Sequence, residues 1–144
     1  MVAAFAMPLA VSERELQDIL ATTALTRNYG FILHSIGEGE CTIRVPFRED
    51  CERPGGVVSG QVCMAAADVA LWLAIKTRLG SADQSVTAEM KTNFLSGARN
   101  EEFLCSARIL KLGNRLIYGT AECRTPSGQL LTHSTITYIR VEPR

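Results

Sequence analysis

The sequence has no surplus of charge and no long apolar run. Its 144 residues include 15 basic and 15 acidic side chains, so the formal net charge is zero. Without a basic surplus the chain is poorly suited to bind a polyanionic duplex, and we expect no nucleic-acid partner. The most apolar segment, 62–75, is shorter than the roughly 20 residues that span a membrane. We therefore expect a soluble, cytoplasmic protein without membrane contact.

Metal ligands and paired cysteines are scarce as well. The chain has two histidines, His34 and His133, and five cysteines, none of them in a C-x-x-C pair. An odd number of unpaired cysteines argues against a disulfide framework and against a zinc site. We therefore expect no metal and no other cofactor.

The pattern of apolar residues predicts the order of the elements. Ser12 and Glu15 form a capping-box signature, which predicts a helix over residues 12–25. Two strands with period-two alternation follow, then a long alanine-rich apolar stretch over 57–79 that predicts a second helix, and then four more strands. In the first of these four strands, Val86, Ala88 and Met90 alternate with polar residues. We expect an N-terminal segment and helix over 1–28 and one domain over 29–144.

Short turns between the strands predict an antiparallel sheet, and only the stretch 57–79 is apolar enough to be wrapped by it. The fold class is therefore α+β, with an antiparallel sheet around a long central helix. One helix and one sheet leave a sheet face and a sheet edge uncovered, which predicts a homodimer or a homotetramer.

Asp68 stands alone among thirteen apolar residues in the segment 62–75. A carboxylate on a buried helix is costly unless it is paired or hydrogen-bonded, and such a group is a candidate general base or nucleophile. The alternative is a structural aspartate that faces solvent, a neighbouring subunit or a backbone amide.

A glycine-rich stretch comes directly before this helix, with Gly55, Gly56 and Gly60. Glycines at a helix start let a ligand approach unpaired N–H groups, which could polarise a carbonyl and stabilise an oxyanion. The alternative is a plain turn into the helix. Gly60 and Asp68 lie about two helical turns apart, so one substrate would meet both only by bending or across a subunit boundary.

These residues resemble the hotdog-fold acyl-CoA thioesterases, specifically the phenylacetic-acid-degradation (PaaI-like) group. That group carries an N-x-x-G-x-x-H-G-G motif, followed by an acid eight residues after the first glycine of the pair. In this chain Gly56, Gly60 and Asp68 match the pattern, whereas Arg53 replaces the asparagine, Ser59 the histidine and Gln61 the second glycine. The similarity covers roughly residues 29–141.

The resemblance implies roles for particular residues. Asp68 would activate water or attack the acyl group, the Gly60 amide would polarise the thioester carbonyl, and Thr87 would help to position water. Arg53, Gly56, Ser59 and Gln61 would contact the substrate in a site shared between two subunits.

Two further expectations concern the substrate. Arg108, Lys111 and Arg115 flank one predicted turn, and Arg115 is the candidate for contacting a phosphate of the acyl-CoA. An acyl pocket is expected beside the central helix, lined by Val62, Ala65, Ala66, Leu71, Trp72 and Met90. Alanines here could instead serve close packing of helix on sheet.

The predicted function is hydrolysis of an acyl-CoA thioester to a free acid and CoA. One alternative is a hydratase or dehydratase on the same fold, against which the lack of histidine between Gly56 and Asp68 argues. The other is a non-catalytic acyl-CoA binding protein. Relatives of that kind carry a DNA-binding helix-turn-helix, for which about 28 N-terminal residues are too few.

Overall fold

The computed structural model describes residues 8–141, and it begins with two short helices in place of the single predicted one. Helix α1 (Glu13–Thr22) has the predicted capping box, in which the Glu15 amide donates to Ser12 Oγ and the Ser12 amide donates to Glu15 Oε2. The prediction of one helix over 12–25 is wrong because Thr23 adopts an extended conformation, after which α2 (Ala24–Tyr29) begins.

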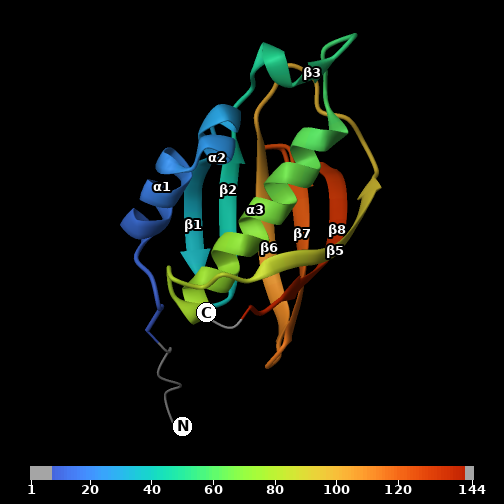
Figure 1. Ribbon diagram of the computed structural model, residues 1–144. Coiled ribbons are helices and arrows are strands. Elements are labelled where there is room, and N and C mark those ends of the chain that lie inside the picture. Colours follow the sequence, from blue (N-terminus) through green and yellow to red (C-terminus); the bar gives the residue numbers. More distant parts are fainter. Residues whose placement is uncertain (1–7, 142–144) are drawn as a thin grey trace, which may run out of the picture.

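Six antiparallel strands form the main sheet, as predicted (Figure 1). Their spatial order is β1-β2-β6-β7-β8-β5, so β5 lies at one edge. The strands are β1 (Ile32–Gly37), β2 (Glu40–Val45), β5 (Val86–Phe94), β6 (Phe103–Leu112), β7 (Leu116–Arg124) and β8 (Leu130–Ile139).

The long central helix α3 (Gly60–Leu79) crosses one face of this sheet (Figure 1). It starts three residues later than predicted, because Val57 and Val58 form a short strand, β4 (Val57–Val58), that pairs with β3 (Glu52–Arg53). A single 3₁₀ turn, η1 (Glu49–Cys51), precedes β3. The fold is therefore α+β, with the long helix packed on an antiparallel sheet.

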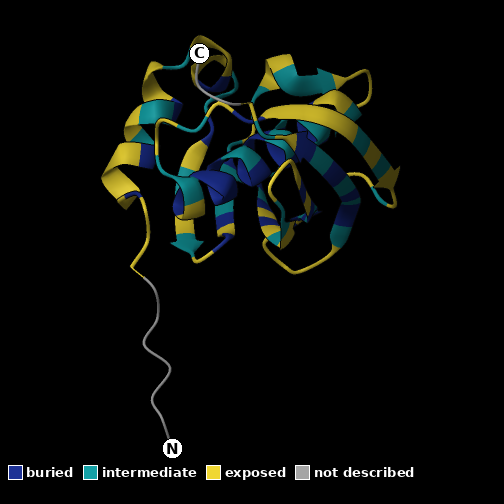
Figure 2. Ribbon diagram, turned by 60° about the horizontal axis from the view of Figure 1, so that its bottom comes forward, coloured by how far each residue is buried: buried dark blue, intermediate teal, exposed yellow. Residues whose placement is uncertain are grey.

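The core lies between α3 and the sheet, and the N-terminal helices belong to it. Leu71, Leu73 and Ile75 of α3 are fully buried, as are Leu16 and Leu20 of α1. Figure 2 shows buried stretches along the central helix and along the strands. Polar contacts also attach this segment: the Leu33 amide donates to the Gln17 side chain, and the Ala10 amide donates to the Thr77 carbonyl. Within residues 8–141, no helix is both long and apolar enough to cross a membrane.

Strand β5 is largely exposed, unlike the other strands that face α3. It pairs only with β8, so its second edge has no strand beside it among the described residues. An open edge of this kind presents a row of backbone N–H and C=O groups that another strand can bind.

Candidate active site

Asp68 lies near the middle of α3 and is held by two hydroxyl groups. Its Oδ1 accepts a hydrogen bond of 2.7 Å from Thr87 Oγ1 and one of 2.6 Å from the Tyr138 hydroxyl. The Tyr138 hydroxyl also lies 2.9 Å from the main-chain oxygen of Asp68. The cost of placing a carboxylate on this apolar helix is thus offset by hydrogen bonds from β5 and β8.

A β-bulge turns Thr87 toward the helix. Thr87 pairs with Tyr138 and Glu89 pairs with Thr137, so Ala88 is an extra residue without a counterpart on β8. Strict alternation would place Thr87 on the face opposite Met90, which packs against the core. The predicted alternation of Val86, Ala88 and Met90 is therefore wrong at this point, because the bulge reverses the direction of the side chains before it.

Tyr138 is the site residue that sequence reasoning missed, because within the alternating pattern of the last strand nothing marks its hydroxyl as a partner of Asp68. It is 3% exposed and lies on the same inward-facing side of β8 as Ile136. Burial and the neighbouring Asp68 carboxylate raise the pKa of Tyr138 above its ordinary value. The phenol therefore stays protonated and keeps donating to Asp68.

A cavity of about 300 Å³ opens beside Asp68. It brings together α2, α3, the start of β5 and the end of β8. Its lining residues are Thr23, Leu25, Thr26, Asp68, Val69, Trp72, Ser85, Val86, Thr87 and Tyr138. Both hydroxyl donors bond to Oδ1, and among the described residues no group donates to Oδ2. Oδ2 is thus the oxygen that can take a proton from water or attack an electrophilic carbon.

Most of the predicted substrate-binding residues meet at the N-terminus of α3. Arg53, Ser59, Gly60 and Gln61 line one cavity of about 430 Å³ together with Met64 and Phe94. Ser59 caps the helix and its Oγ accepts a 3.3 Å hydrogen bond from the Gln61 amide. The Gln61 amide is therefore already bound, and Gly60 carries the first-turn N–H that has no intrahelical acceptor.

Gly60 also has a packing role. A Cβ at this position would lie 2.7 Å from the ring of Phe94, so the ring approaches the helix start only because glycine is there. Gly56 lies apart from this cavity, in the turn between β3 and β4. There its φ of 76° favours glycine, and its amide donates to the Arg53 carbonyl.

Within one chain the predicted catalytic groups do not share a cavity. Gly60 precedes Asp68 by eight helical residues, or about 12 Å along the helix axis. Asp68 and Thr87 line one cavity, whereas Gly60 lines another near Phe94. The structure thus joins Thr87 to Asp68, as expected for neighbouring site residues, and keeps Gly60 away from both.

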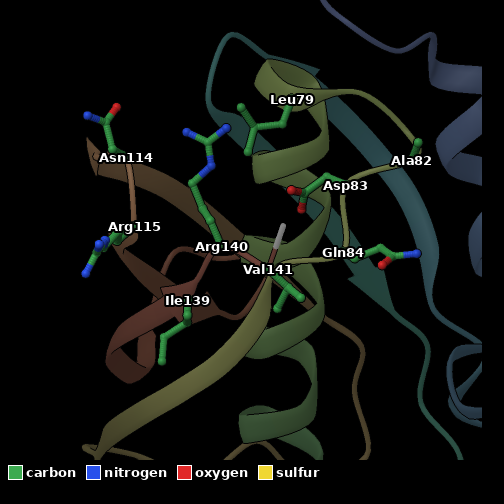
Figure 3. A pocket seen from close by; sticks show the side chains of 9 residues that line it. All are labelled: Leu79, Ala82, Asp83, Gln84, Asn114, Arg115, Ile139, Arg140 and Val141. Carbon is green, nitrogen blue, oxygen red and sulfur yellow. The ribbon is translucent and has the colours of Figure 1, made fainter. Parts of the chain in front are cut away.

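Arg115 lies in a third place, a hollow of about 950 Å³ at the C-terminal end of α3 (Figure 3). The guanidinium of Arg140 extends toward the helix end at Leu79, whereas the Arg115 side chain points outward (Figure 3). Among the described residues neither arginine belongs to an ion pair. No residue lines both this hollow and the Asp68 cavity, although Gln84 and Ile139 of the hollow are chain neighbours of Ser85 and Tyr138 in the Asp68 cavity.

The predicted acyl pocket is wrong for Val62, Ala66 and Leu71, which are buried in the core. Ala65 and Met90 are partly buried against that core, and of the six residues only Trp72 lines the Asp68 cavity. Ala66, which is fully buried, serves close packing of the helix. Cys63 is equally buried, and a hydrogen bond with Cys123 together with burial raises the pKa of its thiol, so it is a core residue. No group of residues within 8–141 is arranged to hold a metal ion.

Two curated relatives cover most of this chain. A protein of Thermoplasma acidophilum, named as a candidate esterase, is 28% identical over 124 residues, which is 86% of this chain and 93% of that one. A protein of Saccharolobus solfataricus with the same description is 31% identical over 96 residues, covering 67% of this chain and 68% of its own length.

Solved structures share the fold. A candidate thioesterase from Silicibacter is 28% identical with a TM-score of 0.84, covering 95% of this chain and 96% of its own. The Escherichia coli PaaI protein, from the phenylacetic acid degradation operon, is 13% identical with a TM-score of 0.81 and covers 90% and 92%. A Streptococcus pneumoniae protein described as a hypothetical thioesterase, solved with coenzyme A, is 12% identical with a TM-score of 0.72 and covers 80% and 88%.

The region that carries Gly60, Asp68 and Thr87 is also the region that matches a known family. The family model described as the thioesterase superfamily matches residues 55–132, more than half of the chain. The match includes all of α3 and β5, which hold these three residues. Together with the hotdog arrangement of long helix and antiparallel sheet, this shows that the chain belongs to the thioesterase superfamily.

Proposed function

We propose that this protein hydrolyses an acyl-CoA thioester to a free acid and CoA. The observation that carries the proposal is Asp68, whose Oδ1 is fixed by Thr87 and Tyr138 beside a cavity while Oδ2 is left available. Membership of the thioesterase superfamily supports hydrolysis. The CoA in the pneumococcal neighbour supports CoA as the carrier.

The two hydroxyls orient Asp68 so that Oδ2 can act on the thioester in one of two ways. As general base, Oδ2 takes a proton from a water molecule, which attacks the carbonyl carbon, and the C–S bond breaks to release the thiol. As nucleophile, Oδ2 attacks the carbonyl carbon directly and the C–S bond breaks, releasing a thiolate that takes a proton from water. A water molecule then hydrolyses the resulting anhydride and restores the Asp68 carboxylate. In either case a Gly60 N–H donates to the carbonyl oxygen as negative charge develops on it.

A second copy of the chain is needed to complete this site. The Gly60 amide and Asp68 of one chain lie in separate cavities, so the amide that serves Asp68 comes from another copy. The open edge of β5 is the surface through which two copies can pair, since nine residues of this strand lack a neighbour on one side. A homodimer is therefore the minimal active unit, and a homotetramer would be a pair of such dimers.

The remaining substrate-binding residues are assigned by their cavities. Arg53, Ser59 and Gln61, next to Gly60, would surround the thioester and the arm that leads to it, with Gly56 shaping the turn behind them. Arg115, with Arg140 in the same hollow at the C-terminal end of α3, would contact phosphates of CoA.

A hydrolysis screen tests the function directly. Purified protein is incubated with short, long and aromatic acyl-CoAs, and the released thiol is followed with a thiol reagent. We expect turnover with at least one thioester, and turnover at least about a hundredfold slower after Asp68→Asn. Binding of acyl-CoA without thiol release would instead support a non-catalytic binding protein.

The shared site has a separate test. Asp68→Asn subunits are mixed and re-paired with subunits in which the Gly60 amide is removed, both inactive alone. Half of the re-paired dimers are mixed and each contains one intact site, so about a quarter of the wild-type activity should return. No recovery, despite proven subunit exchange, would contradict a shared site.

A further inference from the structure

We propose that α2 is the wall of the Asp68 cavity that selects the acyl group, and that Leu25 sets the size of the group accepted. This inference rests on the proposed thioester hydrolysis. It assigns the substrate an uncharged, short or single-ring acyl group.

The position of α2 is fixed by its own buried threonine. Thr26 is 1% exposed, and its hydroxyl donates to the Leu20 carbonyl at 2.7 Å and lies 3.1 Å from the Thr23 carbonyl. The Phe31 amide then donates to the Thr26 carbonyl, so the end of α2 is tied to the start of β1. Because α1 is anchored in the core through Leu16 and Leu20, α2 is a fixed part of the cavity.

The placement of α2 makes Leu25 part of the lining of the Asp68 cavity. Thr23, Leu25 and Thr26 all line the Asp68 cavity together with Asp68, Val69 and Trp72 of α3. Leu25 is 59% exposed, so an acyl group entering the cavity would cover apolar surface that water now contacts. Exposure alone would not distinguish it from other surface leucines, but its place in the lining of the cavity that holds the carboxylate does.

The cavity is suited to a small uncharged group. Asp68 is the only charged side chain among the described residues that line it, and Leu25, Val69 and Trp72 supply apolar surface. A second carboxylate on the substrate would have no cation to pair with here and would lie close to Asp68. The volume of about 300 Å³ is at the small end for a ligand cavity, which favours short chains or one ring.

The part of the chain that supplies this wall lies outside the region shared with the family. The thioesterase match begins at residue 55, whereas α2 ends at Tyr29. Asp68, Trp72 and Thr87 lie inside the matched region. Substitutions in α2 can therefore change which acyl group fits without altering the residues that hold Asp68.

The test compares two leucines of similar exposure. Leu25→Ala and Leu25→Trp are measured beside Leu110→Ala and Leu110→Trp, since Leu110 is 56% exposed and does not line the Asp68 cavity. For each variant kcat/KM is determined with acetyl-, butyryl-, octanoyl-, dodecanoyl- and phenylacetyl-CoA, and a thermal melt confirms folding. Succinyl-CoA is included because it matches butyryl-CoA in chain length and adds one carboxylate.

Leu25→Ala should raise the ratio of octanoyl to butyryl kcat/KM by about tenfold, and Leu25→Trp should lower it by a similar factor, because changing a few methylene contacts has effects of this order. Wild-type protein should also prefer butyryl-CoA to succinyl-CoA by about tenfold or more. The Leu110 variants should keep the wild-type profile. An unchanged profile in the Leu25 variants, or equal use of succinyl-CoA, would overturn the inference while hydrolysis itself stands. Absence of any hydrolysis in wild-type protein would overturn the proposed function instead.

Discussion

The cavity beside Asp68 and the cavity beside Gly60 are built in different ways, although the two residues belong to the same helix and lie about 12 Å apart along its axis. The first is organised by side chains, because Thr87 and Tyr138 reach Asp68 from two strands. The second is organised by backbone: Ser59 caps the helix, and the absence of a side chain at Gly60 lets Phe94 approach. Under the proposed mechanism, the first cavity supplies the carboxylate and the second supplies the amide that binds the carbonyl oxygen, and hydrolysis requires both.

Asp68→Asn should have the largest effect, because it removes the negative charge of the carboxylate and keeps the shape of the side chain. We expect kcat to fall by about 10²–10⁴-fold, the usual contribution of a general base. The melting temperature should change little, since Asn can still accept from Thr87 and Tyr138. A normally folded variant with more than about a tenth of the wild-type rate would contradict the role, because that loss is only about 1.4 kcal/mol.

The role of the Gly60 N–H can be tested with a matched pair of variants, one that keeps this group and one that removes it. Phe94→Ala first removes the ring that a Cβ would meet. In this background Gly60→Ala keeps the N–H and Gly60→Pro removes it. Proline is compatible with the first helical position, and Ser59 already has the extended conformation that a following proline requires.

The proline variant should have a kcat about 10²–10³-fold below that of the alanine variant, the cost of losing one oxyanion donor. The kcat of both variants is measured with the same acyl-CoA, and circular dichroism compares their helix content. Equal rates would mean that Gly60 serves packing against Phe94 and not the carbonyl.

Thr87→Val and Tyr138→Phe should each lower kcat by about tenfold, because each removes one hydrogen bond to a charged group and leaves the other. Thr87→Ser restores a hydroxyl and should recover most of the loss. A rate that falls with Thr87→Ser as much as with Thr87→Val would indicate a packing effect of the methyl group.

Arg115→Ala and Arg140→Ala should act on binding alone. We expect KM for an acyl-CoA to rise by about threefold to fivefold with kcat unchanged, since exposed charge pairs contribute up to about 1 kcal/mol. The N-acetylcysteamine thioester of the same acid lacks the nucleotide, so its KM should not move. Arg108→Ala is the control, because the Arg108 side chain already forms an ion pair with Glu40. A similar rise in KM for both thioesters would place the phosphates elsewhere.

The smallest effect should appear at alkaline pH. The pKa of Tyr138 is raised in the folded state, so the free energy of unfolding gains a contribution that is fully present below about pH 10, the ordinary tyrosine pKa, and declines as the pH rises above it. Urea unfolding of wild-type and Tyr138→Phe protein between neutral pH and pH 11 should show a shallower alkaline decline in the variant. Parallel declines would mean that the phenol is not coupled to the folded state.

Local sequence patterns predicted the architecture well. The Ser12 capping box, the period-two strands and the long apolar helix are all present, since each depends on neighbours only a few residues apart. The structure also brings together residues that the sequence singled out: the Thr87 hydroxyl donates to Asp68, and Arg53, Ser59, Gly60 and Gln61 line one cavity. Their roles in hydrolysis stay predictions.

The features that were missed depend on tertiary structure. The bulge at Ala88 is set by pairing with β8, so alternation within β5 could not predict it. Tyr138 reads as an apolar strand residue until its hydroxyl is found against Asp68, seventy residues away in sequence. The break at Thr23, which brings Leu25 and Thr26 to the Asp68 cavity, has no proline or glycine to announce it.

Strand β5 has a consequence for how the activity should depend on protein concentration. It carries Thr87 to one cavity and Phe94 to the other, and its free edge is the surface proposed to join two copies. Forming the pair and completing the site would then be one event. By mass action, activity per chain would fall on dilution below the dissociation constant of the pair, so the amount of protein in the cell would itself regulate hydrolysis.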